Sequence, residues 1–153
     1  MEYCQDIEQL LQEGRNLNIK PQGYSMYPVL VPGRDEAFIE PLNGRKLKRG
    51  DVVLYRRDKE SESGSILVLH RIWKVKPEGI YLVGDNQKEI EGPLRPDQMK
   101  GIMAAMMRKE KYIPVTEPMY RVLTGIWLWM RPVRPFVSKT VAFVKRKIIT
   151  GKR

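Results

Sequence analysis

The sequence of 153 residues predicts a mainly β fold: a small antiparallel, partly closed sheet with a short N-terminal helix and C-terminal amphipathic helices. Runs of β-branched and aromatic residues recur through the middle of the chain, as is typical of short strands. Turn-forming pairs such as Pro32-Gly33, Asn43-Gly44 and Ser63-Gly64 separate these runs at the spacing of hairpins. A chain of this length is long enough for a single core, so we expect one domain with appended helices.

The first expected element is an amphipathic helix over residues 5–14. Ile7 and Leu11 fall on one face of it, and Gly14 ends it. The segment lacks the apolar core of a signal peptide, so we expect no N-terminal membrane anchor. Cys4 is the only cysteine of the sequence, and no intrachain disulfide is therefore expected.

Several apolar segments in the middle of the chain are expected to form strands. They are residues 29–31, 37–40, 52–55, 66–75, 81–83 and 99–107. We expect 72–75 and 81–83 to pair as a hairpin, and 99–107 to be the last strand. Residues 56–65 are polar and are expected to form a loop.

Charge divides the chain near residue 117. Residues 1–117 contain nineteen Lys and Arg and eighteen Asp and Glu, a net charge of +1, whereas residues 118–153 contain nine Lys and Arg and no acid, a net charge of +9. We therefore expect two parts, a domain over 1–117 and a basic, apolar helical tail over 118–153.

The tail contains two apolar runs, 119–130 and 136–144, and both are shorter than the roughly 18 residues of a spanning helix. Trp and Tyr beside basic residues are typical of helices that lie in the interface of an anionic membrane. We expect peripheral membrane association, on a side that the sequence does not fix. The alternative is a pair of helices packed on the domain or on a partner. We expect no nucleic-acid partner, because the apolar content exceeds what phosphate binding requires.

Three short motifs carry the chemistry of the chain. Ser25 lies in a Gly- and Pro-rich turn, His70 is the only histidine and lies on a predicted strand, and Asp85 follows Gly84 after the next predicted strand. A hydroxyl, an imidazole and a carboxylate are the parts of a serine hydrolase. Ser25 Oγ becomes a nucleophile when a base removes its proton, and an imidazole with a pKa near neutrality can do this.

The ordered motifs resemble those of type I signal peptidases and of the related LexA-type autoproteases. The four motifs are Ser25-Met26-Tyr27-Pro28, Arg49-Gly50-Asp51-Val52-Val53, His70-Arg71-Ile72 and Gly84-Asp85-Asn86, within about residues 20 to 107. The bacterial and LexA-type proteins have Lys as base where this chain has His70, and the endoplasmic-reticulum type has His. The resemblance implies a serine endopeptidase with a Ser25–His70 pair, which cleaves a leader or precursor peptide bound in extended form.

An acid must orient the imidazole, and two candidates remain open. Asp85 is one, with capping of its own turn as the alternative role. Glu91 is the other, because the resemblance to the endoplasmic-reticulum type places the acid seven positions after Gly84. A solvated loop carboxylate is the alternative interpretation of Glu91.

The chain departs from the family pattern at Gly23, where signal peptidases commonly have a second Ser that helps to bind the oxyanion. The Ser25 N–H is then the first candidate for that role. A catalytically silent peptide-binding or membrane-associated β module of the same fold is the alternative function. With one His and one Cys, the sequence has no zinc-ligand spacing, and it has no phosphate-binding Gly-rich loop, so no metal or other cofactor is expected.

Overall fold

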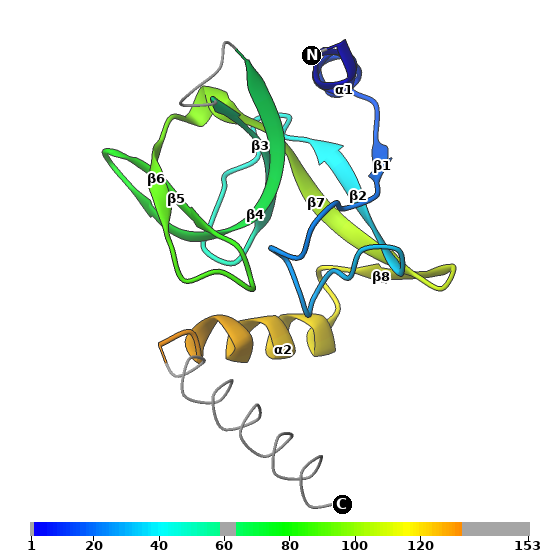
Figure 1. The fold of residues 1–153 in the computed structure, drawn as a ribbon, viewed down its shortest axis with the longest axis vertical. Coiled ribbons are helices and arrows are strands. Elements are labelled where there is room, and N and C mark those ends of the chain that lie inside the picture. The colour runs from blue at the N-terminus through cyan, green and yellow to red at the C-terminus, as the bar shows by residue number, and fades with distance from the viewer. Residues whose placement is uncertain (1, 59–63, 133–153) are drawn as a thin grey trace, which may run out of the picture.

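The computed structural model describes residues 2–58 and 64–132, and these form a mainly β protein, as predicted (Figure 1). The helices are α1 (Glu2–Gln12) and α2 (Pro118–Trp129), with a 3-10 turn at Pro96–Gln98. The strands are β1 (Leu17–Ile19), β2 (Asp35–Pro41), β3 (Val52–Asp58), β4 (Ser65–Lys76), β5 (Gly79–Val83), β6 (Glu91–Leu94), β7 (Met99–Arg108) and β8 (Lys111–Pro114). The second apolar run of the tail, 136–144, lies outside the described residues.

All the strands pair antiparallel in one sheet, in the order β1-β2-β7-β3-β4-β5-β6, with β8 paired to β7. Figure 1 shows β4, β5 and β6 on one side of β3 and β7, and β1, β2 and β8 on the other. Register shifts in β2, β3 and β4 bend the sheet, as bulges do. The order is open, since no strand pairing in the described residues joins β1 to β6, so the partial closure that we expected is not seen.

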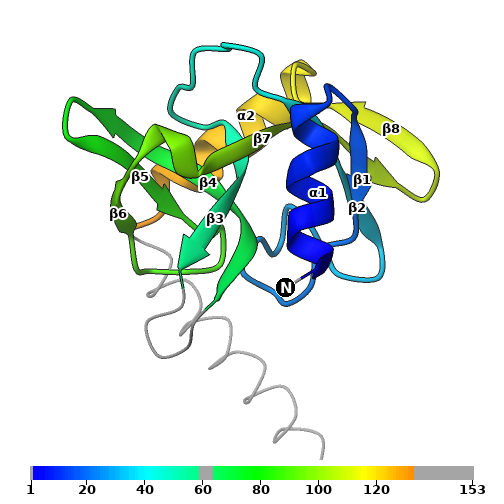
Figure 2. The same cartoon turned by 90° about the horizontal axis from the view of Figure 1, so that it is seen from above.

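The central strand β3 separates two apolar cores. Its side chains alternate, so Val52 and Leu54 enter one core while Val53 and Tyr55 enter the other. The first core also receives Ile7 of α1, which Figure 2 shows alongside β1 and β2. Because all four β3 residues are buried, β3 is the fixed centre against which the other strands are placed.

The expected hairpin is confirmed, since β4 pairs with β5 from Arg71↔Val83 to Lys76↔Gly79. The expected strand at 29–31 is wrong: Leu30 N donates to Met26 O, and Val31 N donates to the Asp35 carboxylate, so the loop itself uses these backbone groups.

Two further expectations need correction. Residues 56–58 belong to β3 and not to a loop, because the ladder with β4 continues to Asp58↔Ser65 and Glu8 and Glu91 bind the charged side chains. The strand β7 is followed by β8 and is internal, because it pairs with both β2 and β3.

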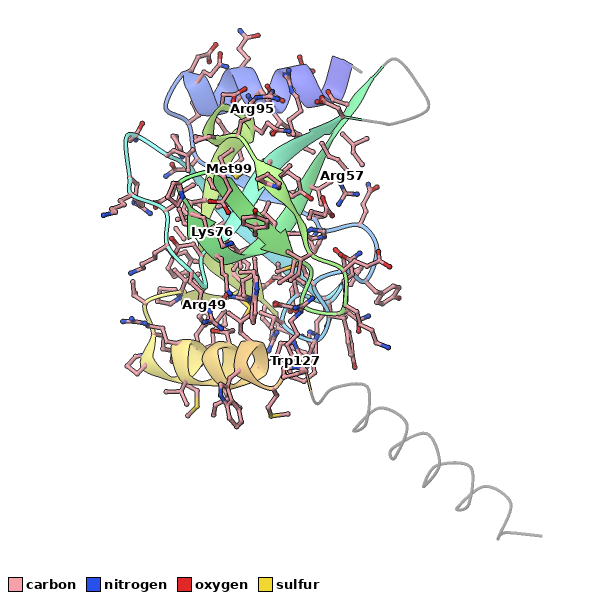
Figure 3. The ribbon with its side chains drawn as sticks, turned by 90° about the vertical axis from the view of Figure 1, so that its left-hand side faces the viewer. Arg49, Arg57, Lys76, Arg95, Met99 and Trp127 are labelled. Atoms are coloured by element: carbon pink, nitrogen blue, oxygen red, sulfur yellow. The ribbon has the colours of Figure 1, made fainter. Side chains whose placement is uncertain are left out.

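The described part of the tail packs on the β domain. Tyr120, Thr124 and Leu128 of α2 are buried against it, and Trp127 Nε1 donates to Asp85 O at 3.0 Å. Figures 1 and 3 show α1 and α2 at opposite ends of the sheet. No helix within residues 2–58 and 64–132 is long and apolar enough to cross a membrane.

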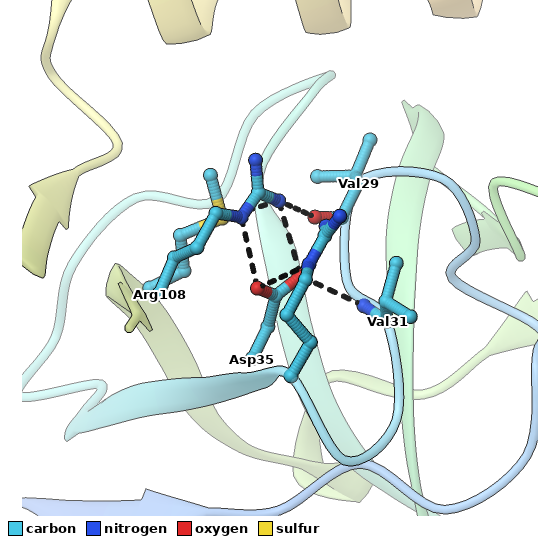
Figure 4. Close-up of polar contacts among 6 residues, drawn as sticks. Val29, Val31, Asp35 and Arg108 are labelled. Atoms are coloured by element: carbon cyan, nitrogen blue, oxygen red, sulfur yellow. Dashed lines mark hydrogen bonds and ion pairs between the residues drawn. The ribbon is translucent and has the colours of Figure 1, made fainter. Parts of the chain in front are cut away.

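A buried carboxylate holds the chain between β1 and β2 in place (Figure 4). Asp35 accepts two hydrogen bonds from each of Arg34 and Arg108, at 2.7–3.0 Å, and one from Val31 N at 2.9 Å. Arg108 also donates to Val29 O. Burial alone would raise the pKa of Asp35, but these hydrogen bonds outweigh it and hold the pKa well below its usual range.

We expect Asp35→Ala to lower the free energy of unfolding by about 3–5 kcal/mol, because it leaves two arginines and a backbone N–H without their buried partner. Urea denaturation followed by circular dichroism measures the change. Asp97→Ala is the matched control, since Asp97 forms an exposed pair with Arg95 and its loss should not be measurable. Equal effects of the two substitutions would contradict the structural role of Asp35.

Candidate active site

Ser25 lies in a tight turn that is anchored on both sides. Tyr27 N donates to Tyr24 O, and Leu30 N donates to Met26 O. Met26 and Leu30 are buried in the first core, so the half-buried Ser25 beside them has a fixed backbone. Met26 is thus a packing residue of the first core.

Gly23 has a backbone conformation that explains its identity. Its φ is +74°, in the left-handed region that side chains disfavour, although a Cβ there would meet open space. A second Ser at this position would therefore strain the backbone. No backbone hydrogen bond in the described residues uses the Ser25 N–H, which leaves this donor for another acceptor.

A second loop, residues 84–86, packs directly on the Ser25 turn. Asn86 N donates to Ser25 O at 2.7 Å. A Cβ on Gly84 would lie 2.7 Å from Ser25 O, so only glycine allows this approach. The two sequence motifs are therefore in contact.

The same loop links the Ser25 turn to the pair of strands that carries His70. The ladder between β4 and β5 starts at Arg71↔Val83, so His70 directly precedes this first pair on β4 and Gly84 directly follows it after β5. No hydrogen bond joins the Ser25 hydroxyl to the His70 ring among the described residues. Hydrogen bonds of this kind are often long without substrate and shorten when it binds.

The His70 ring is buried in a polar network. Its Nδ1 lies 3.2 Å from the Tyr55 hydroxyl and 3.4 Å from Glu91 Oε1. Tyr55 donates its proton to Glu91 Oε2 at 2.5 Å, and Arg57 donates to Tyr55 Oη and to Glu91. Tyr55 has only one proton to donate, so its oxygen must accept from His70 Nδ1–H.

This network assigns the tautomer of the only histidine. With the proton on Nδ1, the lone pair lies on Nε2, the ring nitrogen that faces away from Tyr55 and Glu91. A neutral imidazole with a free Nε2 is the form that can remove a proton from a hydroxyl.

Burial lowers the pKa of His70 to about 4, because the charged imidazolium loses its water. Glu91 raises the pKa and Arg57 lowers it, so these neighbours partly cancel. We had expected a titration near neutrality. The structure instead keeps His70 neutral over most of the pH range. Burial also raises the pKa of Tyr55, which keeps its hydroxyl protonated as the donor to Glu91.

The two candidate acids have different partners. Asp85 is fully buried and forms a two-fold ion pair with Arg71, with Nε–Oδ1 and Nη2–Oδ2 distances of 2.8 and 2.7 Å. Glu91 is the carboxylate that lies beside His70 Nδ1. The charge of Asp85 raises the pKa of His70, whereas Glu91 lies beside the ring and also binds Tyr55.

Tyr55 and Arg57 are site residues that the sequence analysis missed. The signal was available: they are two positions apart on a strand that precedes the histidine strand, so they share one face of a hairpin with His70. Arg57 was missed because the polar character of residues 56–65 predicted a loop there.

A cleft of about 430 Å³ runs along β4 and is open to Ser25. It is lined by Ser25 and Met26, by residues 19–23 and 66–69, and by Ile7 and Leu54. Residues 65–70 of β4 pair with β3 on one side, but β5 pairs only with residues 71–76. The other edge of β4 is therefore free along the cleft, as far as the described residues show.

Among the described residues, no three His, Cys, Asp or Glu side chains lie together as metal ligands would. Comparisons with protein-family models, with curated proteins and with solved structures found no match. The case for a function thus rests on the geometry of this chain.

We expect the single His70 imidazole to give the nitrogen resonances of the neutral Nδ1–H tautomer from pH 8 to about 5, and to titrate near pH 4. The unfolded chain binds this proton near pH 6.5, so the free energy of unfolding should fall as the pH drops from 6.5 towards 4. Nitrogen NMR and urea denaturation measure the two effects. A midpoint at or above 6.5 in the folded protein would contradict the buried network.

Proposed function

We propose that this protein is a serine endopeptidase of the signal-peptidase type, with Ser25 as nucleophile and His70 as general base. The observation that carries the proposal is the position of His70 Nδ1 beside Tyr55 and Glu91, on a strand whose neighbouring loop binds the Ser25 backbone. The order of the motifs, which resembles the signal-peptidase and LexA-type superfamily, supports the same fold and chemistry.

In the proposed reaction, Ser25 Oγ attacks the carbonyl carbon of the substrate while His70 Nε2 takes the hydroxyl proton. The imidazolium then gives this proton to the leaving amine, and the acyl-enzyme forms. Water, activated by the same nitrogen, releases the acyl group and restores Ser25. The carboxylate of Glu91 stabilises the positive charge of the imidazolium, and Tyr55 Oη accepts its Nδ1–H. Ser25 N–H donates to the oxyanion.

The substrate is proposed to be a leader or precursor peptide in extended form. The free edge of β4 offers unpaired backbone groups along residues 65–70, so a peptide can add as a strand that ends at Ser25. Apolar side chains line the cleft, so alternate side chains of the peptide would enter an apolar surface.

We expect Ser25→Ala and His70→Ala to lower kcat/KM equally, by about 10⁴-fold or more, because the two residues act as one unit. Cleavage of a peptide library by the purified protein supplies the substrate for the assay. The kcat/KM of the unaltered protein should rise through an apparent pKa near 4 and stay flat to about pH 8.

A pair of substitutions tests the role of Glu91. Glu91→Gln should lower kcat by about 10²- to 10⁴-fold, while the control Glu89→Gln, at an exposed acid of the same loop, should have no effect. A rise of activity only above about pH 9 would assign the base to a lysine such as Lys74. Peptide binding without cleavage, unchanged by Ser25→Ala, would identify a silent peptide-binding module.

We also propose that the protein attaches peripherally to anionic membrane through α2 and the basic tail. The inner face of α2 packs on the β domain, yet its outer face is apolar too. The residues on the outer face are Met119, Val122, Leu123, Ile126 and Trp129, each at least half exposed. An apolar stripe at helical spacing, followed by a region of charge +9 from residue 118 onward, suits an anionic interface.

We expect full-length protein with Val122, Ile126 and Trp129 all changed to Ser to lose sedimentation with phosphatidylglycerol vesicles, because burial of the stripe in the interface is lost. Peptide cleavage in solution should be unchanged, since these side chains point away from the domain. Val75→Ser, at an equally exposed apolar residue of β4, is the control. Undiminished sedimentation of the triple variant would exclude the stripe as the membrane contact.

A further inference from the structure

A second cavity lies between the β domain and α2. Its volume is about 390 Å³, and it shares no lining residue with the cleft beside Ser25. Residues 48–52, at the start of β3, form one wall, and α2 forms the opposite wall from Tyr120 to Leu128. Figure 3 shows Arg49 at the end of the sheet that faces α2.

The cavity has an excess of positive charge. Four basic side chains line it, and Arg71 is neutralised by Asp85. The other three are Lys48, Arg49 and Arg121, and none of them forms an ion pair with a described acid. Asp51 is the only acid in the lining, so about two positive charges remain uncompensated.

A buried hydroxyl also lines the cavity, and its proton has no acceptor among the described residues. Tyr120 is 8% exposed, and its Oη faces the Arg71 guanidinium but makes no hydrogen bond of normal geometry within the described residues. Burial raises the pKa of Tyr120, so the hydroxyl keeps its proton. A buried donor of this kind normally has an acceptor, because an unmet one costs free energy.

The basic surface continues beyond the cavity across Trp73. The Arg49 guanidinium lies 4.6 Å from the centre of the Trp73 ring, and the Arg131 guanidinium lies 5.1 Å from it. Arg131 Nε is the other buried side-chain atom without a hydrogen-bond partner in the described residues. Both atoms thus lie along the junction of α2 with the sheet, where basic side chains outnumber acids.

We propose that this cavity binds a phosphate-type oxyanion, with Lys48, Arg49 and Arg121 supplying charge and Tyr120 donating a hydrogen bond. Guanidinium groups bind phosphate oxygens through paired N–H donors, and a phenol adds a directed donor. The volume admits a phosphate with a small substituent such as glycerol. Both a free phosphate and a lipid headgroup offer this chemistry, and the outer face of α2 beside the cavity makes a headgroup reachable.

Isothermal titration calorimetry on the full-length Ser25→Ala protein tests the site, with inorganic phosphate and glycerol phosphate as ligands. Because this protein is catalytically inactivated, failure here is independent of the proposed peptidase. We expect binding that Tyr120→Phe weakens about tenfold, a loss of about 1.4 kcal/mol. Arg49→Gln should weaken it at least as much. Arg15→Gln, at an exposed residue that follows α1, should have no effect.

Vesicles identify the source of the phosphate. Sedimentation with phosphatidylglycerol that falls in Tyr120→Phe and Arg49→Gln, and that glycerol phosphate competes away, assigns the site to a lipid headgroup. Calorimetric binding of inorganic phosphate, with vesicle binding equal in all variants, assigns it to a free anion. Either result supports the site.

The proposal fails if neither ligand binds and no cavity variant alters vesicle binding. It also fails if Arg15→Gln weakens binding as much as Arg49→Gln does, since general charge then explains the affinity. Thermal unfolding without ligand checks that each variant is folded. Arg49→Gln keeps the test valid should Tyr120→Phe unfold, because Arg49 is exposed.

Discussion

The buried ion pair between Arg71 and Asp85 is the interaction on which the rest of the structure depends. Arg71 belongs to β4 and also donates to Gly50 O, while Asp85 belongs to the loop that binds the Ser25 backbone. A buried charge pair is stable when further hydrogen bonds satisfy its atoms, and the bond from Arg71 to Gly50 O is one of these. Breaking it would leave a charge in the interior and release the loop that binds the Ser25 backbone.

The carboxylate proposed to orient His70 is Glu91, and it does not belong to the Arg71–Asp85 pair. Glu91 is partly exposed and lies beside His70 Nδ1. The Tyr55 hydroxyl binds both the Glu91 carboxylate and His70 Nδ1, and it thereby fixes the orientation of the ring. Arg57 holds both groups, and its positive charge offsets the negative charge of Glu91. The imidazole is thereby fixed in direction without being made strongly basic, because burial outweighs the carboxylate.

The sequence predicted the strands whose side chains alternate and the hairpin that follows His70, since these depend on local pattern and turn residues. It also predicted Ser25, His70 and Glu91 as candidates. It failed where contacts between distant residues decide. Arg108 binds Asp35, whose carboxylate accepts from Val31 N in place of the expected strand, and Glu8 and Glu91 bind the arginines that extend β3. The sequence could not decide between Asp85 and Glu91, because the difference between them depends on the ion pair that Arg71 forms with Asp85.

The hydrogen bond from Trp127 to Asp85 O has a mechanical consequence. The same short helix has one apolar face on the sheet and another turned outward, and its indole is bonded to the loop beside the serine turn. A shift of α2 would therefore move the acceptor of the indole, Asp85 O, in the loop that also binds Ser25 O. A surface or partner that binds the outer face of α2 would therefore be connected to the Ser25 turn through Trp127 and the loop at 84–86.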